Sequence, residues 1–435
     1  MSRAAAPRLV AVALLATLGV VLVWNTWHFP WRQGYDATAS AHYAEVLGDV
    51  HRLPHRDETD VWHNPPLFFL VAGAIYRTAE SVPVIQPGRA VQLLDALCVL
   101  GIAVLTLGIA REVFPRRRWL PVLSLLLAVL TPVLVRAGAL FHPEPLATLL
   151  TTAALFVVVR ALRRRLLGWR AGLLAGALLG LANVTRTWAL AAVAAVLLGL
   201  ALDLLWRRDR ATLRTLVAVT AATSAFVVPW LVVKAETYGS PLAYSRPVAE
   251  QWRQHGRPAS FWLDLATGDV ARRPYQPWFR NVLLPTVYAD WWGDYWRAWR
   301  VPVRLHDEPD VLPPRDAAPL RRQMLAGLAA SVVILAGLVA LAARAWRRRD
   351  AAVATLVLSV ALLVVSFVGF LVQYPKQDGD NIKALYVLNA APVLALAGAY
   401  ALSWLWRRGW LGAAVAALVV VVLAVPTVLF VVLPG

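Results

Sequence analysis

Side chains that can do chemistry gather in one short polar stretch near the N-terminus. Asp36, His42 and His63 all fall between Gly34 and Leu67, directly after an apolar run of membrane-spanning length. Loops that only solvate the end of a helix have little need of an acid and two histidines together. A carboxylate held this close to a bilayer could act as a general base that takes the proton from an acceptor hydroxyl. The stretch therefore predicts acid–base chemistry at a membrane surface.

Asp36 also has a purely structural interpretation. Residues 37–47 have helical periodicity, and a carboxylate just before a helix can accept hydrogen bonds from the first backbone N–H groups. At helical spacing, His42 would lie near the face of Asp36. A cap and a general base are both open at this point. The prolines that follow His63 explain a rigid helix start, but they do not explain the histidine.

A second turn again places an acid beside a histidine. His142 and Glu144 are two residues apart, and Glu144 could also favour a helix start through the helix dipole. Two cations, Arg186 and Lys383, occupy turns that we expect at the same face of the membrane. Cations at helix ends can simply reach toward the headgroups. They are equally suited to hold a lipid phosphate at headgroup depth, where charge-assisted pairing is strong.

The composition sets the class of the protein. Of 435 residues, 59% are hydrophobic and 16% are charged, and apolar runs of about 20 residues recur along the chain. This pattern predicts an all-α polytopic membrane protein and excludes a β-barrel of short alternating strands. The single cysteine, Cys98, excludes an intrachain disulfide and a cysteine metal cluster. The net charge of +18 does not indicate a nucleic-acid partner, because the basic residues are scattered between apolar runs.

Arginine clusters between the apolar runs set the orientation. Short arginine-rich loops stay in the cytoplasm, so the N-terminus, with Arg3 and Arg8, is expected there as well. The first apolar run lacks a cleavage site and reads as a retained span. Residues 66–79 are short for a span and are predicted to lie in the outer interface, with a short tilted span as the alternative. About eleven spans are predicted, near residues 9–24, 89–113, 119–136, 144–162, 171–184, 187–206, 215–233, 321–343, 351–373, 384–405 and 410–432.

The acids are distributed as this topology requires. Only Glu112, Asp203, Asp209 and Asp350 fall inside and Asp95 falls within a span, so the other 20 of 25 acids face outward. We expect three regions. Residues 1–233 form an N-terminal transmembrane catalytic core with a first extracytoplasmic loop, 25–88. Residues 234–320 form a tryptophan-rich extracytoplasmic loop, and residues 321–435 supply the C-terminal transmembrane helices.

The tryptophans of the long outer loop carry a prediction of their own. Tryptophan favours the headgroup level of a bilayer, so we expect this loop to lie on the membrane and not to form a separate globular domain. The residues concerned are Trp252, Trp262, Trp278, Trp291, Trp292, Trp296 and Trp299.

Several short motifs follow one another in a recognisable order. They are Gly34-Tyr35-Asp36 with His42, Leu53-Pro54, His63 to Leu67, the acid Glu144, Gly180-Leu181 to Thr185-Arg186, Pro229-Trp230 with Tyr238-Gly239 and Pro241, and Lys383, Tyr386, Leu388 and Pro392. In this order they resemble the membrane glycosyltransferases of the GT-C fold, in the group around protein O-mannosyltransferases and lipid A aminoarabinose transferases. The resemblance extends over about residues 9 to 400.

The resemblance implies an inverting transfer of a sugar from a polyprenyl-phosphate donor to an acceptor hydroxyl on the outer face. It makes Asp36 the base, Glu144 a second acid, and Arg186 and Lys383 ligands of the donor phosphate. The full set of substrate-binding candidates is His42, His63, His142, Arg186, Lys383 and Tyr386. Many members have Asp-Glu where this chain has Asp36-Ala37, which weakens a metal-chelating role for the loop. No cofactor is certain, and a divalent metal, although chemically feasible, is not implied by the motifs.

The expected partners follow from this reaction. They are the polyprenyl-phosphate sugar, membrane lipids and a glycan, lipid or protein acceptor, with the active site on the extracytoplasmic side of a bacterial cell membrane. No nucleotide is expected, because no glycine-rich phosphate loop is present. A transporter or flippase of a lipid-linked sugar is the main alternative, but it favours ionisable groups near the midplane, where the chain offers only Asp95. A noncatalytic envelope-assembly protein is the other alternative, and it would tolerate Asp36→Asn and Glu144→Gln.

Overall fold

The computed structural model describes residues 5–82, 84–244, 256–276, 282–299, 314–376 and 379–434. Every regular element in these ranges is a helix. In chain order they are α1 (Ala6–His28), α2 (Ala37–Glu45), a π-helical turn (Val46–Val50), α3 (Leu67–Glu80), α4 (Pro87–Val113), α5 (Leu120–Val129), α6 (Pro132–Ala137), α7 (Glu144–Arg164), α8 (Trp169–Asn183), η2 (Thr187–Ala189), α9 (Leu190–Arg207), α10 (Arg210–Tyr238), α12 (Ala259–Leu263), α13 (Thr267–Arg272), α14 (Leu283–Trp292), α15 (Pro314–Arg348), α16 (Ala351–Gln373), η3 (Ala384–Ala390), α17 (Ala391–Trp406) and α18 (Trp410–Val431).

Nine helical segments of the described chain are long and apolar enough to cross a bilayer. They correspond to nine of the predicted spans, and the all-α polytopic class is therefore confirmed. The described part of the first span begins after Arg3, which lies outside the described residues. The spans are Ala6–His28, Pro87–Val113, Glu144–Arg164, Thr187–Arg207, Arg210–Tyr238, Ala317–Arg348, Ala351–Gln373, Ala384–Trp406 and Trp410–Val431.

The two other predicted spans, 119–136 and 171–184, are helices of less than membrane length. The first is interrupted after Val129, because Pro132 has no N–H to continue the ladder and instead begins the buried helix α6. The second, α8, has 15 residues and is roughly 22 Å long at 1.5 Å per residue. The total of eleven spans therefore stays a prediction.

Glycines set the distance between α8 and α10. A Cβ at Gly172 would lie 2.6 Å from the carbonyl oxygen of Thr215, and one at Gly176 would lie 2.6 Å from that of Val219. Small residues spaced four apart let two helix backbones meet in this way within a membrane. The close pairing fixes the turn that follows α8, and that turn carries Arg186.

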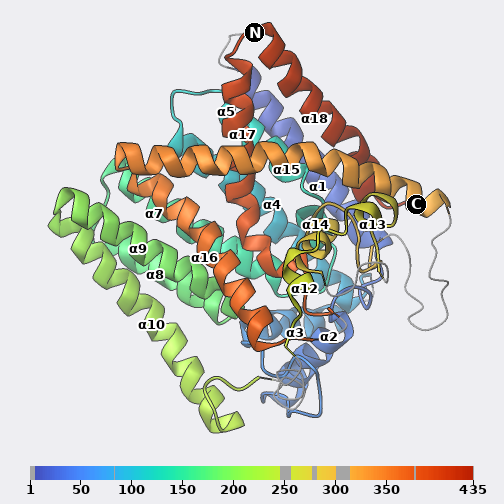
Figure 1. Cartoon of the computed structure of the whole chain (residues 1–435). Helices are drawn as coiled ribbons and strands as arrows, with labels where there is room; N and C mark the ends of the chain where they lie inside the picture. The colour runs from blue at the N-terminus through green and yellow to red at the C-terminus, as the bar shows by residue number, and fades with distance from the viewer. Residues whose placement is uncertain are drawn as a thin grey trace.

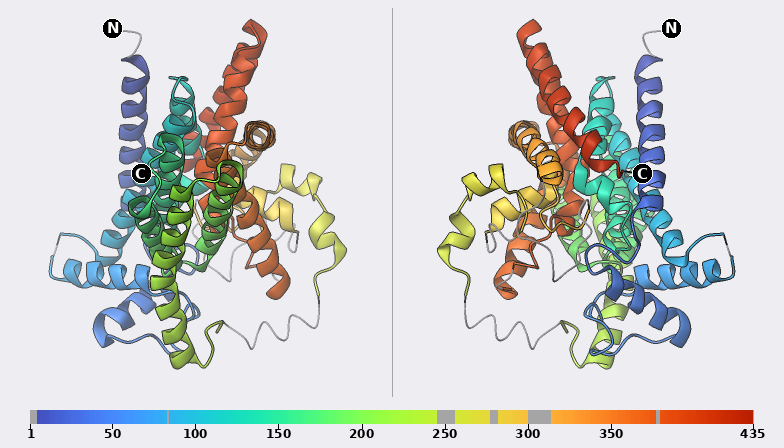
Figure 2. Two further views of the ribbon diagram at one scale, coloured as in Figure 1. Left: turned by 90° about the vertical axis from the view of Figure 1, so that its left-hand side faces the viewer. Right: turned by 90° about the vertical axis from the view of Figure 1, so that its right-hand side faces the viewer.

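The first outer loop folds into α2 and α3, which pack on each other through aromatic rings. Tyr43 stacks on Phe69 with ring centroids 4.0 Å apart, and both rings are completely buried. The Tyr43 hydroxyl also donates a 3.1 Å hydrogen bond to the carbonyl of Asn64. Figure 2 shows α3 lying across the direction of α1 and not along it. The interfacial location of α3 stays a prediction, and this orientation agrees with it.

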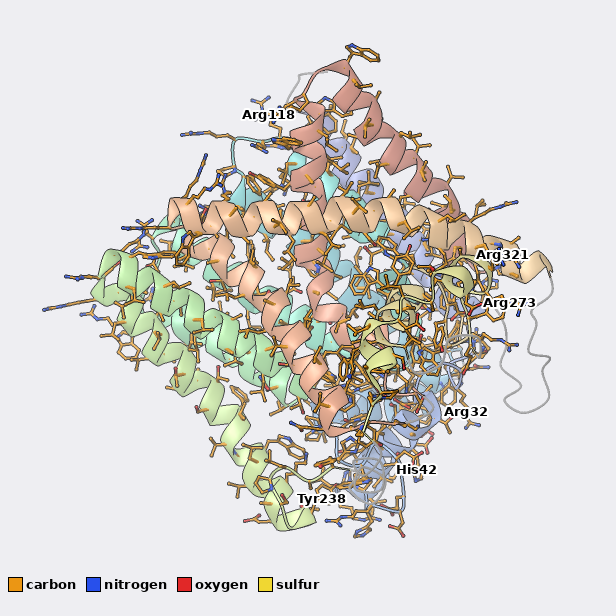
Figure 3. The ribbon with its side chains drawn as sticks, viewed as in Figure 1. Arg32, His42, Arg118, Tyr238, Arg273 and Arg321 are labelled. Atoms are coloured by element: carbon orange, nitrogen blue, oxygen red, sulfur yellow. The ribbon has the colours of Figure 1, made fainter. Side chains whose placement is uncertain are left out.

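The end of α10 fastens this loop to the helical bundle. The Tyr238 hydroxyl donates a 2.9 Å hydrogen bond to the carbonyl of Pro54, and Arg56 donates a 2.6 Å bond to the carbonyl of Tyr238. The Tyr238 ring also contacts Trp62, with centroids 4.7 Å apart. In Figure 3, Tyr238 and His42 mark the end of the molecule where the loop lies, and Arg118 marks the opposite end.

The tryptophan-rich loop does not present its described rings to the headgroups as expected. Trp291, Trp292 and Trp299 are each less than 9% exposed and join the main hydrophobic core. The indole of Trp292 donates to Ser331 of α15 at 2.8 Å, and that of Trp296 donates to the carbonyl of Ile382 at 3.0 Å. The expectation was wrong for these rings because the indole N–H groups have partners inside the protein. Trp252 and Trp278 lie outside the described residues.

Candidate active site

Asp36 sits at the junction between the first span and α2, in an unusual backbone conformation. Its φ of 50° lies in the left-handed region, which aspartate tolerates better than bulkier residues. Its side chain makes no capping bond to α2. Both carboxylate oxygens instead lie 3.4 Å from the Nζ of Lys383, which enters from the turn before η3. The structure therefore speaks against a helix-cap role for Asp36, and the general base is the interpretation that stays open.

Lys383 is buried between two carboxylates. Its side chain is 5% exposed, and its Nζ lies 3.5 Å from Asp380 as well as 3.4 Å from Asp36. Burial alone would raise the pKa of Asp36, but the charges of Lys383 and Arg186 outweigh burial and hold that pKa below its usual value. Burial would likewise lower the pKa of Lys383, and Asp36 instead raises it. Both groups are therefore ionised at neutral pH.

Arg186 is the second buried cation of the site, and two oxygens hold it in place. Its Nε donates a 2.6 Å bond to Glu144, and its Nη1 donates a 2.6 Å bond to the side chain of Asn64. Its guanidinium also lies 5.5 Å from the ring centroid of Tyr386. Glu144 is fully buried, and its second oxygen has no hydrogen-bond partner among the described residues. Glu144 therefore orients and neutralises Arg186.

The three candidate histidines occupy three different environments. His63 belongs to the site: its Nδ1 is buried and has no partner in the described structure, and burial with the charges of Lys234 and Arg186 lowers its pKa to about 3. His142 lies beneath the site, where its Nδ1 accepts a 3.3 Å bond from the backbone N–H of Glu144. His42 points to the surface and lies 3.5 Å from Glu45. The structure thus does not bring His42 to Asp36.

One carboxylate that the sequence analysis missed ties the site together. Asp290, near the end of α14 in the tryptophan-rich loop, accepts a 2.5 Å bond from the Tyr35 hydroxyl on one oxygen and a 2.7 Å bond from the backbone N–H of Ala384 on the other. Tyr35 precedes Asp36, and Ala384 follows Lys383. Asp290 therefore fixes the two chain segments that carry the ion pair. Arg136 balances its charge at 3.5 Å.

Lys234 and Asn64 were also missed. Lys234, near the end of α10, is 9% exposed and lies 6.0 Å from the ring centroid of Trp230, with no carboxylate in contact among the described residues. Asn64 follows His63 in the first outer loop, and its side-chain oxygen accepts a 2.6 Å bond from Arg186. Neither position carries a signal in the sequence, because an isolated lysine or asparagine near a helix end is usually a solvated group.

An aromatic surface adjoins the cations. Trp188 lies against Tyr386 with ring centroids 5.7 Å apart and against Phe370 at 5.2 Å, and Tyr386 also faces Lys383 and Arg186. This arrangement can hold an anionic group against the cations and an apolar chain along the rings. No group of three or more histidine, cysteine, aspartate or glutamate side chains able to hold a metal ion occurs in the described ranges.

The chain is similar to known proteins in both sequence and fold. The family described as dolichyl-phosphate-mannose-protein mannosyltransferase matches residues 63–232. The oligosaccharyltransferase of Archaeoglobus fulgidus in its apo form superposes with a TM-score of 0.56 at 16% identity, over 97% of this chain and 55% of that chain. Its complex with an inhibitory peptide and a dolichol-phosphate gives a TM-score of 0.55 at 15% identity, over 97% and 55%. This chain thus spans about half the length of the archaeal protein.

ArnT from Cupriavidus metallidurans, bound to undecaprenyl phosphate, superposes with a TM-score of 0.42 at 17% identity, over 91% of this chain and 78% of that chain. No curated protein sequence matches the chain. The chain is a multi-pass membrane protein with the GT-C fold, and its residues 63–232 match the dolichyl-phosphate-mannose-protein mannosyltransferase family, as the resemblance in its sequence motifs predicted.

Proposed function

We propose that the chain is an inverting glycosyltransferase that moves a sugar from a polyprenyl-phosphate donor to an acceptor hydroxyl on the outer face of the membrane. The observation that carries the proposal is the meeting of Asp36 with buried cations from distant parts of the chain. Lys383 lies 3.4 Å from the carboxylate, and Arg186 is close enough to lower its pKa. A base beside phosphate ligands is the pairing that this reaction needs.

The donor would bind with its phosphate at Lys383 and Arg186. Both residues are less than 9% exposed, so their attraction to an anion is weakly screened by water. The rings of Trp188, Tyr386 and Phe370 would hold the first isoprene units of the lipid. The family that matches residues 63–232 is named for a dolichyl-phosphate-linked donor, and the archaeal protein of similar fold was solved with a dolichol-phosphate.

The transfer would follow from these positions. Asp36 takes the proton of the acceptor hydroxyl, and the acceptor oxygen bonds to the anomeric carbon opposite the phosphate. The bond between that carbon and the phosphate oxygen breaks, and the polyprenyl phosphate leaves with the electron pair. Lys383 and Arg186 stabilise the charge that develops on the leaving phosphate. One displacement inverts the anomeric configuration.

Donor binding would also activate the base. Lys383 holds the pKa of Asp36 below its usual value, and a base with such a low pKa is weak. A phosphate that draws Lys383 to itself would relieve this effect, so the pKa of Asp36 would rise toward the range of a useful base. Proton abstraction would thereby depend on a bound donor.

Glu144 would serve this mechanism indirectly. Its contact with Arg186 at 2.6 Å and its complete burial support a positioning role and leave no room for an acceptor at its bonded oxygen. His63 would remain neutral, since its pKa is lowered to about 3, and could donate or accept a single hydrogen bond to the sugar.

The experiment is a transfer assay with purified protein and a panel of polyprenyl-phosphate hexoses and pentoses. The product's anomeric configuration should be opposite to that of the donor, as seen by NMR, and free polyprenyl phosphate should appear in equal amount. Retention of configuration would contradict the single displacement. Movement of intact donor across a liposome membrane without release of polyprenyl phosphate would favour the transporter.

A further inference from the structure

A groove at the far end of the molecule combines an apolar wall with a cluster of arginines. Its volume is about 840 Å³, and it lies between α1, α4 and the beginning of α5. Four arginines line it: Arg8 of α1, Arg111 of α4, and Arg117 and Arg118 from the turn before α5. In Figure 3, Arg118 lies at the end of the molecule opposite His42 and Tyr238, which flank the candidate active site.

No acid lines this groove. Within the described part of the chain, none of the four arginines has a carboxylate within 4.0 Å. The described contacts of Arg117 are with the Ser403 hydroxyl at 3.3 Å and with the rings of Phe114 and Tyr400 at 5.5 Å. Burial and the charges of Arg407, Arg344 and Arg348, which lie outside the lining of the groove, lower the pKa of Arg117.

Five arginines outside the groove, at the same end of the helices, pair with acids. Asp350 lies 2.8 Å from Arg163 and 3.8 Å from Arg344, and Glu112 lies 2.8 Å from Arg164. Asp203 similarly contacts Arg165 and Arg207, and Asp209 contacts Arg165. All four acids that the topology assigns to this side are thus used by arginines outside the groove. No acid of the described chain is therefore left to pair with the four arginines of the groove.

The shape and chemistry of the groove identify that ligand. The apolar wall includes Val12, Leu15, Val104 and Leu107, of which Val12 is 64% and Val104 is 47% exposed. Because α1 and α4 are membrane spans, this wall faces acyl chains. A soluble anion would not cover the wall, and an uncharged lipid would leave the arginines unpaired. Guanidinium groups bind phosphates through paired N–H donors.

We propose that the groove is a binding site for an anionic phospholipid, with the phosphate held by the arginines and the acyl chains along α1 and α4. Basic pockets between membrane helices bind anionic headgroups in this manner. The bound lipid would bridge α1 to the turn between α4 and α5. It is distinct from the polyprenyl-phosphate donor, which would bind at the opposite end.

The test uses delipidated full-length protein in neutral detergent, with phosphatidylglycerol or phosphatidylcholine added. Phosphatidylglycerol should raise the thermal midpoint and remain bound in native mass spectrometry, and phosphatidylcholine should do neither. Arg111→Gln with Arg118→Gln should weaken phosphatidylglycerol binding by at least about tenfold. The matched control, Arg347→Gln with Arg349→Gln, removes equal charge from exposed arginines outside the groove and should bind as the wild type does.

Equal loss in both double variants would overturn the proposal, because binding would then follow net charge alone. Equal stabilisation by glycerol phosphate would overturn it as well, since no acyl chain would be needed. A second variant, Val104→Trp, fills the exposed wall and keeps every arginine. It should weaken lipid binding even if the arginine variant fails to fold, and unchanged binding by Val104→Trp would contradict the placement of the acyl chains.

Discussion

At the scale of single residues, the candidate site consists of buried cations that are each paired with a carboxylate. Lys383 has Asp36 and Asp380 as neighbours, and Arg186 has Glu144. Each proposed phosphate ligand therefore already has a carboxylate partner, which reduces the cost of burying its charge. An incoming phosphate must displace or share these carboxylates. This exchange gives the cations a role in the proposed transfer that differs from that of ordinary structural ion pairs.

The phosphate ligands give the first prediction. Arg186→Gln and Lys383→Gln should each weaken donor binding or slow donor turnover by about tenfold or more, because a charge-assisted contact contributes roughly 1.5–3 kcal/mol. Lys376→Gln is the control, since Lys376 pairs with Asp380 at 2.5 Å and not with the base. Turnover of donor at the wild-type rate by both Arg186→Gln and Lys383→Gln would remove these residues from the phosphate site.

The second prediction concerns His63 and pH. Its pKa in the folded protein is about 3, against an ordinary value of 6.5. Between pH 6.5 and 3, the unfolded chain binds a proton at His63 and the folded chain does not. The folded protein therefore has its full stability from this group above pH 6.5, and loses that stability as pH falls toward 3. Thermal unfolding at pH 7 and pH 5 should show a smaller loss of stability on acidification for His63→Gln than for the wild type. Identical losses would show that His63 is not held neutral.

Sequence patterns singled out candidate residues that the structure brings together, but not the residues that hold them in place. Asp36, Arg186 and Lys383 stood out because each lies in a turn at the end of an apolar run that the topology assigns to the outer face. Asp290 could not be found, since nothing in a sequence indicates that it meets Tyr35 at a separation of 255 residues. His42 was assigned from helical spacing alone, and spacing does not determine which face of α2 packs inward. The exposed face carries His42.

At the scale of elements, the site depends on one clamp between three segments. Asp290 bonds the Tyr35 hydroxyl and the backbone of Ala384, so the turn before α2 and the turn before η3 are held in one register. The left-handed conformation of Asp36 lies directly beside this contact. A residue in a sparsely populated conformation persists when its surroundings fix it, and such residues cluster at functional sites.

The third prediction tests the clamp. Tyr35→Phe removes one buried hydrogen bond and should cost about 1–3 kcal/mol of stability. It should also reduce kcat more than it changes the KM for donor, because the base would lose its alignment with the acceptor. The control is Tyr288→Phe, which loses a partly buried 2.5 Å bond from the same helix, α14, to the carbonyl of Met324 in α15. Equal effects of both substitutions on kcat would show that the contact between Tyr35 and Asp290 only stabilises the fold and does not align the base.

Helices of membrane length were predictable because apolar runs and arginine clusters mark them directly. The interruption between α5 and α6 was harder, since the apolar run continues through Pro132 and only the missing N–H ends the first helix. The tryptophan-rich region was misjudged for a different reason. Indole rings suit both the headgroup level and a protein core, and only the partners of their N–H groups, such as Ser331 for Trp292, decide between the two.

At the scale of the whole molecule, polar chemistry and positive charge are separated along the helices. Asp36, Lys383 and Arg186 gather at one end, and the arginine-lined groove lies at the other. The positive-inside rule assigns the arginine end to the cytoplasm. Figures 1 and 2 show α2 and α3 at the end that carries the site, opposite the N-terminal end of α1.

The fourth prediction fixes the orientation in the cell. Cysteines introduced at Asp57 and Asp269 should react with a membrane-impermeant thiol reagent added to intact cells, and a cysteine at Arg164 should react only after permeabilisation. The native Cys98 is buried, so the unmodified protein supplies the unlabelled background. Labelling at position 164 in sealed cells would reverse the topology and put the proposed site on the wrong face.

The central claim is that Asp36 is the base of a transfer reaction, and one pair of variants measures it directly. Asp36→Asn and Asp380→Asn each remove one carboxylate from the same lysine, at 3.4 and 3.5 Å. Reconstituted Asp36→Asn should transfer sugar from a polyprenyl-phosphate donor about 10²–10⁴-fold more slowly than the wild type, because an amide cannot take the proton. Asp380→Asn should lose less than about tenfold, and both should keep the wild-type melting temperature within a few degrees. Near-normal transfer by a folded Asp36→Asn protein would contradict the account.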